Sequence, residues 1–405
     1  MTQRVCPICF TTKYKPIFDE VIDDFDGTAF DTRVLVVCCE ECGFVYNIPD
    51  FTSSCLEDHY QNEALYQTEA GFGVGGTTPA DISRYARYYG LLEPYLAPKN
   101  KNIVDIGCSK GGFLAFLRTK GLVNLTGIEL DPICAEYARK THNLQILSGS
   151  ANTVPLPNNS VDILIFSHVL EHVDDPAHVL EETRRILKED GVVFVEVPNA
   201  LHYADAKMFD YFYWFGMREH INHFDATHLS MLMKRAGFET CQLSEAIVSP
   251  NESQLTAGSS RLFPMLAGIF KNTTFKPVAE ETTQNLLNDA MGRYIDSETS
   301  VVDSDKDKID SLMYSGKPIY VWGIALEFFC LYSFGGLKNC NIHALVDKSA
   351  FKQTKTVSGL RIVSPETLMS VGTDATVVIT SSFHADAMQE FLADIAFAGE
   401  VMVFK

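Results

Sequence analysis

Four cysteines near the amino terminus have the spacing of a metal site. Cys6 and Cys9 form one Cys-x-x-Cys pair, and Cys39 and Cys42 form a second. Two such pairs, each on a tight turn, can present four thiolates to a Zn²⁺ ion in a tetrahedron. Because four protein ligands leave no open position, such an ion would be structural. Cys38 lies beside Cys39, so the sequence leaves open which of the two is the third ligand.

A second group of residues could hold a nucleotide cofactor. The stretch 103–113 begins with a short apolar run, and Gly107 and Gly111 follow it. This pattern is typical of a buried strand, a tight turn and a helix start, whose unpaired backbone N–H groups face a ligand. Glu129 ends a second apolar run about 20 residues later, where an acid would accept hydrogen bonds from ribose hydroxyls. An NAD site needs a glycine where this chain has Ser109, so that pattern fails.

The order of motifs around this turn resembles the class I S-adenosylmethionine (SAM)-dependent methyltransferases. The pattern Asp-x-Gly-Cys-x-x-Gly begins at Asp105, and Gly-x-Glu-x-Asp begins at Gly127. The stretches 149–151, 161–172 and 187–197 continue the resemblance in the same order. The resemblance implies that SAM is bound by Asp105, Gly107, Cys108, Gly111, Glu129, Leu130, Ser150, Ala151 and Ser167.

Apolar runs and helical periodicity alternate around these motifs. Strands are expected at 103–106, 125–128, 163–166 and 192–197, and helices at 112–120, 132–141 and 176–188. Alternating strands and helices predict an α/β fold with a doubly wound, mostly parallel sheet. Ligands of such sheets bind at the carboxyl ends of the strands, so the motif residues are expected around one crevice.

The chain is expected to divide into five segments. They are a zinc-binding module at 1–60, a loop and a helix before the core at 61–98, the SAM-binding core at 99–248, a helical connector at 249–314 and a second Rossmann-like α/β domain at 315–405. The first turn of the last domain has a single glycine, so cofactor binding is not expected there. Four glycines in 71–76 favour either a mobile lid over the active site or a plain linker, and both remain open.

Composition and charge limit the classes of function. Of the 405 residues, 46% are hydrophobic and 21% are charged, and the formal net charge is −19. Nucleic acid is not an expected partner, because its binding takes much of its affinity from Lys and Arg. No membrane span is expected, since no apolar run approaches the ~18 residues that one needs. The first residues lack the apolar core of a secretory signal, and the eleven cysteines are then expected to be reduced or metal-bound in the cytoplasm.

A histidine-rich stretch follows the fourth expected strand of the core. Residues 218–229 contain three histidines and two carboxylates. A histidine beside a carboxylate is poised near neutral pH to take a proton, and His220 next to Glu219 is therefore the candidate base. His223 and His228 are expected to be packing or helix-cap residues, and a zinc site built from the three imidazoles is not expected.

The domain order as a whole resembles the nucleotide-sugar C-methyltransferases, which act on deoxysugars. The resemblance rests on the four-cysteine module, the SAM core, the Glu-His motif, and the stretches 346–348 and 359–365 of the last domain. It implies that His220 removes a proton next to a keto group and that Glu219 orients this imidazole. His172 or Tyr66 would hydrogen-bond the enolate oxygen. The implied cofactors are SAM and a structural Zn²⁺ ion, and the implied partner is a small molecule, a nucleotide sugar.

The chain departs from that family at the substrate end. Met217 and His223 stand where the family often has tyrosines, and the glycine run replaces a tyrosine-rich motif. Three other functions remain open, namely O- or N-methylation of another small metabolite, methylation of RNA, and a zinc-ribbon adaptor without catalysis. The net charge of −19 argues against RNA, and the intact Asp105, Gly107 and Glu129 argue against an adaptor. The sequence indicates no oligomeric state.

Overall fold

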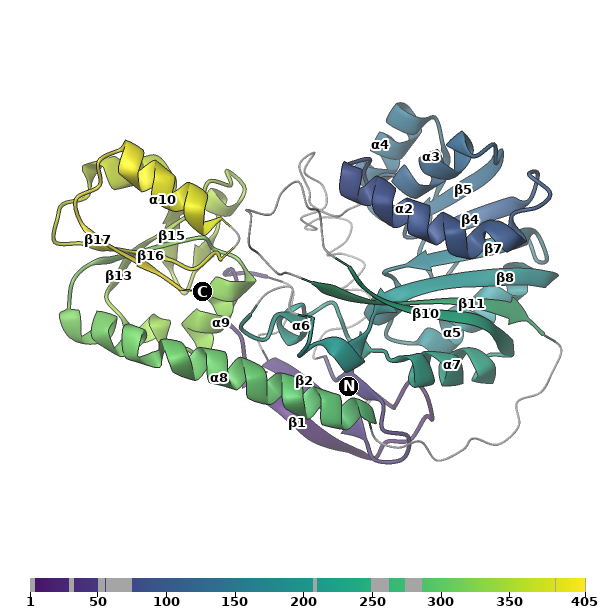
Figure 1. Ribbon diagram of the computed structural model, residues 1–405, viewed down its shortest axis with the longest axis horizontal. Coiled ribbons are helices and arrows are strands. Elements are labelled where there is room, and N and C mark those ends of the chain that lie inside the picture. The colour runs from purple at the N-terminus through teal and green to yellow at the C-terminus, as the bar shows by residue number, and fades with distance from the viewer. Residues whose placement is uncertain are drawn as a thin grey trace. The chain divides into compact units, whose positions relative to one another are not determined.

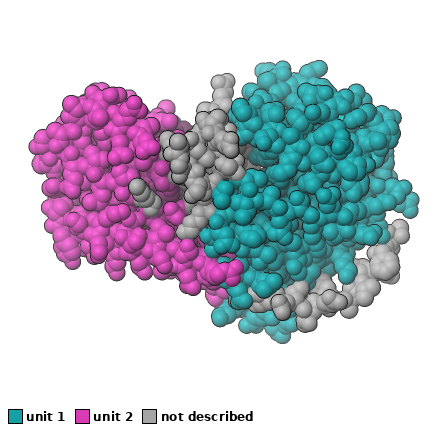
Figure 2. Space-filling model, viewed as in Figure 1, with its two compact units in different colours: residues 1–15, 37–206, 219–290 teal, residues 16–36, 207–218, 291–405 magenta. Residues whose placement is uncertain are grey.

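The computed structural model describes residues 4–28, 33–49, 55, 75–206, 210–248, 262–273, 286–382 and 384–404. The chain forms two compact units (Figure 2). Unit 1 comprises 1–15, 37–206 and 219–290, and unit 2 comprises 16–36, 207–218 and 291–405. Each unit therefore combines segments that are far apart in the sequence. None of the described helices has a stretch long and apolar enough to cross a membrane.

The main sheet of unit 1 has seven strands (Figure 1). Their order is β10 (Phe238–Val248), β11 (Phe263–Asn272), β8 (Leu187–Pro198), β7 (Val161–Ser167), β4 (Asn102–Ile106), β5 (Asn124–Glu129) and β6 (Gln145–Ser148). In the central register, Ile103 of β4 lies between Leu125 of β5 and Ile163 of β7. β8, β7, β4, β5 and β6 are parallel, whereas β11 is antiparallel to both of its neighbours. The expected α/β core with a mostly parallel sheet is confirmed.

Helices cover both faces of this sheet. α2 (Pro79–Leu92), α3 (Gly112–Thr119) and α4 (Pro132–His142) lie on one face, and α5 (Pro176–Ile186) and α7 (Ala226–Arg235) lie on the other (Figure 1). Tyr88 and Phe113 of the first group belong to the same buried cluster as Phe194 of the sheet. Strands buried on both faces are mostly apolar, which explains the nearly continuous apolar runs in the sequence.

Local signals start two of these helices. Thr78 caps α2 in a capping box with Asp81, so that each side chain accepts from the backbone of the other. Asp131 caps α4 and precedes a proline at the first helical position. Both caps lie near the turn that follows β4. Asp81 lies beside Gly76, which packs on Gly112, and Asp131 donates its N–H to Glu129, which also holds Ser109.

β11 corrects the expectation of a helical connector at 249–314. Phe263–Asn272 forms a strand of the main sheet between β8 and β10, and its residues 264–270 are all buried. A strand buried on both faces lacks the polar–apolar alternation by which strands are recognised in a sequence. α8 (Leu286–Ser315) is one helix of 30 residues that accounts for the rest of the described segment.

Another sheet contains four strands within the described residues, and the second Cys-x-x-Cys pair lies where the second of them leads into the third. They are β1 (Tyr14–Val21), β2 (Arg33–Cys39), β3 (Val45–Asn47) and β9 (Asn222–His223), in this order. β3 and β9 are antiparallel, with Val45 opposite His223 and Tyr46 opposite Asn222. This pairing joins the histidine-rich stretch to the strand that follows the last cysteine pair.

Unit 2 contains a separate α/β sheet of six strands. Their order is β14 (Thr356–Val357), β15 (Leu360–Val363), β13 (Ile342–Val346), β12 (Ile319–Trp322), β16 (Thr376–Ile379) and β17 (Glu400–Val403). All pairs are parallel except β14 with β15. The described helices of unit 2 are α6 (Tyr213–Gly216), α9 (Leu326–Ser333), α10 (Ala385–Asp394) and most of α8.

Candidate functional site

The turn after β4 is shaped for a close approach by a ligand. Gly107 and Gly111 have φ angles of 70° and 75°, and Ser109 between them has 48°. Left-handed φ angles favour glycine, which explains the two glycines of the motif. The N–H of Gly112 donates to the carbonyl of Gly75 at 2.8 Å. A Cβ added at Gly112 would lie 2.5 Å from that oxygen, so Gly75 lies directly over the turn.

Glu129, at the end of β5, holds this turn through both carboxylate oxygens. Oε2 accepts from the N–H of Ser109 at 2.7 Å, and Oε1 accepts from the N–H of Asp131 at 2.8 Å. Burial raises the pKa of Glu129, and the two backbone donors offset part of this effect. Each carboxylate oxygen has a second lone pair. Glu129 can therefore stiffen the turn and still accept hydrogen bonds from the hydroxyls of a ligand.

Asp105 lies in β4, two residues before Gly107, and is 4% exposed. Its Oδ1 has no hydrogen-bond partner among the residues that the structure describes. Burial, and then the charge of Glu129, raise the pKa of Asp105 to about 8. A ligand that brings positive charge would stabilise such a pair of buried acids. SAM carries an ammonium and a sulfonium group, so the residues of this turn fit SAM.

The other expected SAM contacts lie at the carboxyl ends of neighbouring strands. They are Leu130 after β5, Ser150 and Ala151 after β6, and Ser167 at the end of β7. Because these strands are parallel, their ends meet at one edge of the sheet. Cys108 offers only its backbone to the turn, because a Cβ at Gly127 would lie 2.4 Å from the Cys108 sulfur. The Cys108 thiol is thus packed against β5.

A buried network of charges joins the ends of β7 and β8. Nδ1 of His168 lies 2.9 Å from Glu171 Oε1, and its Nε2 lies 3.6 Å from Glu196 Oε1. Arg87 donates two hydrogen bonds to Glu196, and Tyr88 donates a third. Burial disfavours the imidazolium form of His168, but hydrogen bonds with both carboxylates outweigh it and raise the pKa of His168 to about 9. The network therefore holds a positive ring between two carboxylates.

Two further histidine rings meet beside this network. His172 ends the short 3₁₀ helix η3 (Leu170–His172), and its ring centroid lies 4.6 Å from that of His220, with the planes at 87°. Nδ1 of His172 lies 3.0 Å from the carbonyl oxygen of Glu219. Burial, and then the neighbouring histidines, lower the pKa of His220 well below its ordinary value of 6.5. These surroundings therefore favour the neutral imidazole, the form in which a histidine begins a proton abstraction.

The histidine pair and the glycine turn lie on adjoining segments of unit 1. A Cβ added at Gly107 would lie 3.0 Å from Cγ2 of Val169, so the turn packs against the residue that precedes η3. Val169 is three residues before His172. The expected cofactor turn thus packs against the segment that leads to His172, whose ring in turn contacts that of His220.

Residues near the cysteine module hold the His220 segment in place. Asn47 donates its backbone N–H to the carbonyl of Ile221 at 2.9 Å and its side-chain amide to that of His220 at 3.2 Å. Arg4 donates to the carbonyl of Ile221 at 2.9 Å and to Oδ1 of Asn222 at 2.7 Å. The amide of Asn222 then donates to carbonyls at both ends of the η3 segment. The module therefore fixes one histidine segment against the other.

Two of the expected catalytic residues, Glu219 and Tyr66, are not seen in the expected roles. The first takes part through its backbone, and the second lies outside the described residues. Glu219 contributes its backbone carbonyl, and the carboxylate beside the histidine pair is that of Glu171. Tyr66 lies outside the described residues, as do residues 71–74 of the glycine run.

The two histidines that were expected to be packing residues are buried and hydrogen-bonded. His223 lies 3.0 Å from Oδ1 of Asn47 through its Nε2. His228 contacts Asp225 at 2.7 Å and the carbonyl of Cys42 at 2.9 Å. Both rings therefore connect the histidine-rich stretch to the cysteine module.

Sequence reasoning assigned no role to Glu171, Glu196 and Arg87. Glu196 carries a signal, because a charged residue in the apolar run 192–197 requires a partner when it is buried. Glu171 adjoins His172, but the sequence does not indicate that its carboxylate turns inward. Arg87 lies on an ordinary amphipathic helix and carries no signal.

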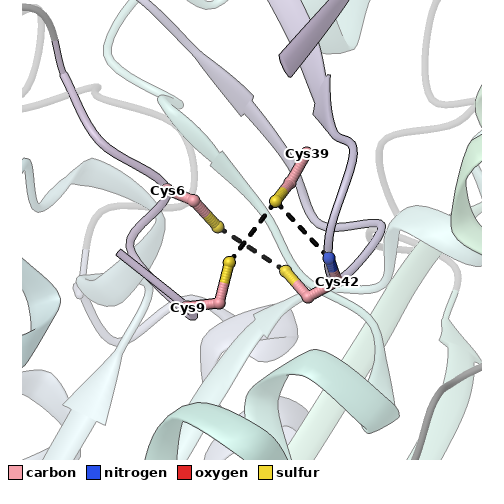
Figure 3. A group of neighbouring side chains, drawn as sticks. All are labelled: Cys6, Cys9, Cys39 and Cys42. Atoms are coloured by element: carbon pink, nitrogen blue, oxygen red, sulfur yellow. Dashed lines mark hydrogen bonds between the residues drawn. The ribbon is translucent and has the colours of Figure 1, made fainter. Parts of the chain in front are cut away.

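The four cysteines of the amino-terminal module face one another (Figure 3). The sulfur of Cys6 lies 3.6 Å from that of Cys42, and the sulfur of Cys9 lies 3.4 Å from that of Cys39. Zn–S bonds of about 2.3 Å would place tetrahedral ligands about 3.8 Å apart, so the set fits a Zn²⁺ ion. Cys38 directs its sulfur to the backbone carbonyl of Cys39 at 3.7 Å. Cys39 is therefore the third member of the cluster.

Comparisons with known proteins identify the domain that contains the glycine turn. Residues 81–243 match the family model described as a methyltransferase domain. A probable S-adenosylmethionine-dependent methyltransferase of Mycolicibacterium smegmatis is 27% identical over 143 residues, which are 34% of this chain and 52% of that protein. The ubiquinone biosynthesis O-methyltransferase of Actinobacillus pleuropneumoniae is 28% identical over 109 residues, 24% of this chain and 46% of that protein. The chain thus spans about half the length of the curated relatives it matches.

Solved structures give similar matches. A SAM-dependent methyltransferase from Methanosarcina mazei has a TM-score of 0.38 at 16% identity, and the match covers 46% of this chain and 98% of that one. Geranyl diphosphate C-methyltransferase from Streptomyces coelicolor has a TM-score of 0.39 at 13% identity, covering 54% of this chain and 97% of that one.

Proposed function

Because residues 81–243 carry a class I SAM-dependent methyltransferase domain, we propose that this chain transfers the methyl group of SAM to a carbon of a nucleotide-linked keto-deoxysugar. The observation that carries the proposal is the buried ring of His220, which meets the ring of His172 on the η3 segment that adjoins the glycine turn. A carbon acceptor must first lose a proton, and a neutral imidazole within the site can take it. The resemblance to nucleotide-sugar C-methyltransferases supports the sugar as the acceptor.

The histidine pair can divide the work of such a reaction. His220 accepts the proton from the carbon next to the ketone, and the electron pair of the C–H bond moves into the enolate. Because Nδ1 of His172 donates to the Glu219 carbonyl, Nε2 is the nitrogen left for the enolate oxygen, and it can donate to that oxygen only when both ring nitrogens carry a proton. SAM supplies an electrophilic methyl group when it is bound. The methyl group would pass to the enolate carbon, and the sulfur of SAM would keep the electron pair of the C–S bond.

A structural zinc ion in the four-cysteine cluster belongs to this proposal. The ion would hold the module from which Arg4 and Asn47 reach the His220 segment. Loss of zinc is therefore expected to loosen the base while leaving the glycine turn in place. Metal analysis of the purified protein and of Cys9→Ser, together with SAM affinity, checks this point.

Unit 2 is included as a second Rossmann-like domain. Its parallel order β15, β13, β12, β16 and β17 supports this assignment, because β12, the first strand of this sheet in sequence, is central. We assign no cofactor to unit 2.

The proposal is tested by two measurements on the same panel of nucleotide-linked 4-keto sugars. In the first, the sugars are incubated with the protein in D₂O without SAM, and deuterium at the carbon next to the ketone is followed by NMR. In the second, methyl-labelled SAM is added and the labelled atom is located. Wild type is expected to exchange and methylate one sugar at carbon, whereas His220→Ala does neither.

A matched control is His178→Ala, an exposed histidine of the same unit, which is expected to behave as wild type. Tight SAM binding without exchange or label on any keto sugar would contradict the acceptor. Label found on an oxygen or nitrogen of another metabolite would show that this metabolite, and not a keto sugar, is the methyl acceptor.

A further inference from the structure

We propose that Glu171, His172 and His220 form a second metal site, which binds a divalent transition-metal ion through one carboxylate and two imidazoles. The ion-binding part stands on geometry alone, and only its effect on catalysis rests on the proposed function. The three residues come from the η3 segment and from the stretch before β9, both within unit 1. They are distinct from the four cysteines.

The ligand atoms are close enough to share an ion. One carboxylate oxygen of Glu171 and one nitrogen from each ring all lie within 4.8 Å of one another. Glu171 Oε1 lies 4.0 Å from Nε2 of His172. Bonds of about 2.0–2.2 Å to a shared ion would place such atoms about 3–4.3 Å apart.

The orientation of His172 suits a metal ligand. Its Nδ1 lies 3.0 Å from the carbonyl oxygen of Glu219, which can only accept a hydrogen bond. In the neutral ring the proton is therefore on Nδ1 and the lone pair is on Nε2. Histidine ligands of metal ions usually donate their other ring N–H to a carbonyl or carboxylate in this way.

Glu171 supplies a buried carboxylate that the ion would share with the ring of His168. The residue is 1% exposed, and its Oε1 is hydrogen-bonded to His168 at 2.9 Å. Its Oε2 is buried and has no hydrogen-bond partner within the described part of the chain. A buried carboxylate oxygen in this state is costly, and a bound cation would satisfy it.

The two segments that carry the ligands are held together before any ion binds. The N–H of Ile221 donates to the carbonyl of Glu171 at 2.8 Å. Asn222 donates to the carbonyls of Leu170 and Val173 at 2.9 and 2.6 Å. A metal ion would therefore enter a preorganised set of ligands.

The donor set indicates the class of ion and its effect. Two imidazoles and one carboxylate leave coordination positions open and suit Fe²⁺, Co²⁺ or Zn²⁺, whereas four thiolates favour Zn²⁺ in a closed site. An ion bound to His220 takes the lone pair that the proposed reaction needs for the proton. Occupancy of the site is therefore expected to inhibit deprotonation of the acceptor.

The test is a titration of the full-length protein with Co²⁺ after the cysteine cluster has been filled with one equivalent of Zn²⁺. Calorimetry is expected to show one Co²⁺ per chain, without the intense thiolate-to-cobalt absorption that exchange into the cysteines would give. Glu171→Gln and His172→Gln are each expected to weaken Co²⁺ binding by at least about 100-fold, since loss of a supporting partner alone costs 10–100-fold. His178→Gln serves as the matched control and is expected to bind as wild type does.

The metal site would be refuted if the wild-type protein, with zinc in its cysteine cluster, bound no Co²⁺. It would also be refuted if Glu171→Gln and His172→Gln both bound Co²⁺ as tightly as wild type. SAM affinity and thermal unfolding show whether each variant is folded, and His220→Gln replaces a variant that is not. In the exchange assay, Co²⁺ is expected to inhibit wild type at its binding concentration. Cobalt binding without exchange on any sugar would refute the proposed acceptor and leave the metal site standing.

Discussion

The turn after β4 in unit 1 and the turn after β12 in unit 2 have the same hydrogen-bonding pattern, but the charges around them differ. In unit 1, Glu129 after β5 accepts the N–H of Ser109 in the turn and a second N–H two residues beyond itself. In unit 2, Asp347 after β13 accepts the N–H of Ile324 at 3.0 Å and again a second N–H two residues on. In both units the acid therefore ties the end of the second strand to the turn after the first.

The difference is the group that balances each acid. Lys352 lies 3.0 Å from Asp347 and also donates to the carbonyl of Ile324 at 2.6 Å. In unit 1, Asp105 adds a second buried acid whose Oδ1 lacks a partner among the described residues. The turn of unit 2 is thus completed by its own lysine, whereas that of unit 1 calls for a cationic ligand. An acid after the second strand indicates a stiff turn, and only an unbalanced one indicates a cofactor.

The largest effect is expected when the acid that holds each turn, Glu129 in unit 1 or Asp347 in unit 2, is replaced by its amide. Glu129→Gln places an amide NH₂ opposite one of two backbone N–H groups, which opens the turn. SAM affinity is expected to fall at least about 100-fold, near the upper end of 1–3 kcal/mol for a buried unsatisfied donor. Calorimetry with SAM measures this loss.

Asp347→Asn is the matched change in unit 2. It is expected to lower the free energy of unfolding by a similar amount and to leave SAM affinity within about twofold. A comparable loss of SAM affinity in both variants would show that the two turns do not differ as described.

The second prediction removes the lysine of unit 2. Lys352→Met is expected to lower the free energy of unfolding by about 2 kcal/mol, less than the 3–5 kcal/mol of a fully buried pair, because the two side chains are 19% and 10% exposed. Adding Asp347→Asn to this variant is expected to cost less stability than the same change in wild type, because the carboxylate has already lost its lysine. Urea unfolding of wild type, the two single variants and the double variant decides the point, and additive losses would mean that the lysine does not balance the acid.

The third prediction concerns the pH dependence of Asp105. Burial, and then Glu129, raise its pKa to about 8 in the native protein, against 3.8 for the ordinary carboxyl. The native SAM-free protein then binds more protons than the unfolded chain between about pH 4 and 8. Its free energy of unfolding therefore falls as pH rises through that window. SAM, which is cationic, is expected to bind more tightly as pH rises toward 8.

Asp105→Asn is expected to remove the pH dependence of the free energy of unfolding and that of SAM affinity. Above pH 8 the SAM-free variant should be more stable than wild type by about 1–3 kcal/mol, while its SAM affinity should be about tenfold weaker. Thermal unfolding and calorimetry from pH 5 to 9 measure both. Parallel pH profiles of variant and wild type would show that Asp105 is ionised in the empty site.

The parts of the site that the sequence predicted are those set by neighbouring residues. The turn at Gly107, the acid at Glu129 and the Cys-x-x-Cys pairs each arise from residues close in sequence, where glycine conformation and ligand spacing leave a pattern. Cys39 was separated from Cys38 only by the structure, because both occupy the end of β2 and differ in the direction of the side chain.

The parts that were missed depend on pairing between distant segments. Glu171 and His220 meet because Asn222 and Arg4 bind carbonyl groups of the η3 segment, and these contacts have no period or motif. Glu219, which adjoins His220 in sequence, contributes its backbone carbonyl to His172. Adjacency in sequence pointed to Glu219, whereas the carboxylate that clusters with the two histidines is that of Glu171.

The smallest expected effects compare one glycine from each turn. Gly107 has a φ of 70° and a Cβ there would lie 3.0 Å from Val169, whereas Gly323 has a φ of 104° and a Cβ there would lie 2.8 Å from Ser381. Alanine at either position is expected to cost about 1 kcal/mol of stability, because both φ angles are left-handed. Gly107→Ala should also weaken SAM binding about threefold to tenfold by displacing Val169, and Gly323→Ala should not. Because Val169 leads into His172, Gly107→Ala is further expected to slow deuterium exchange in the absence of SAM, which would separate a displaced histidine pair from a weakened cofactor site.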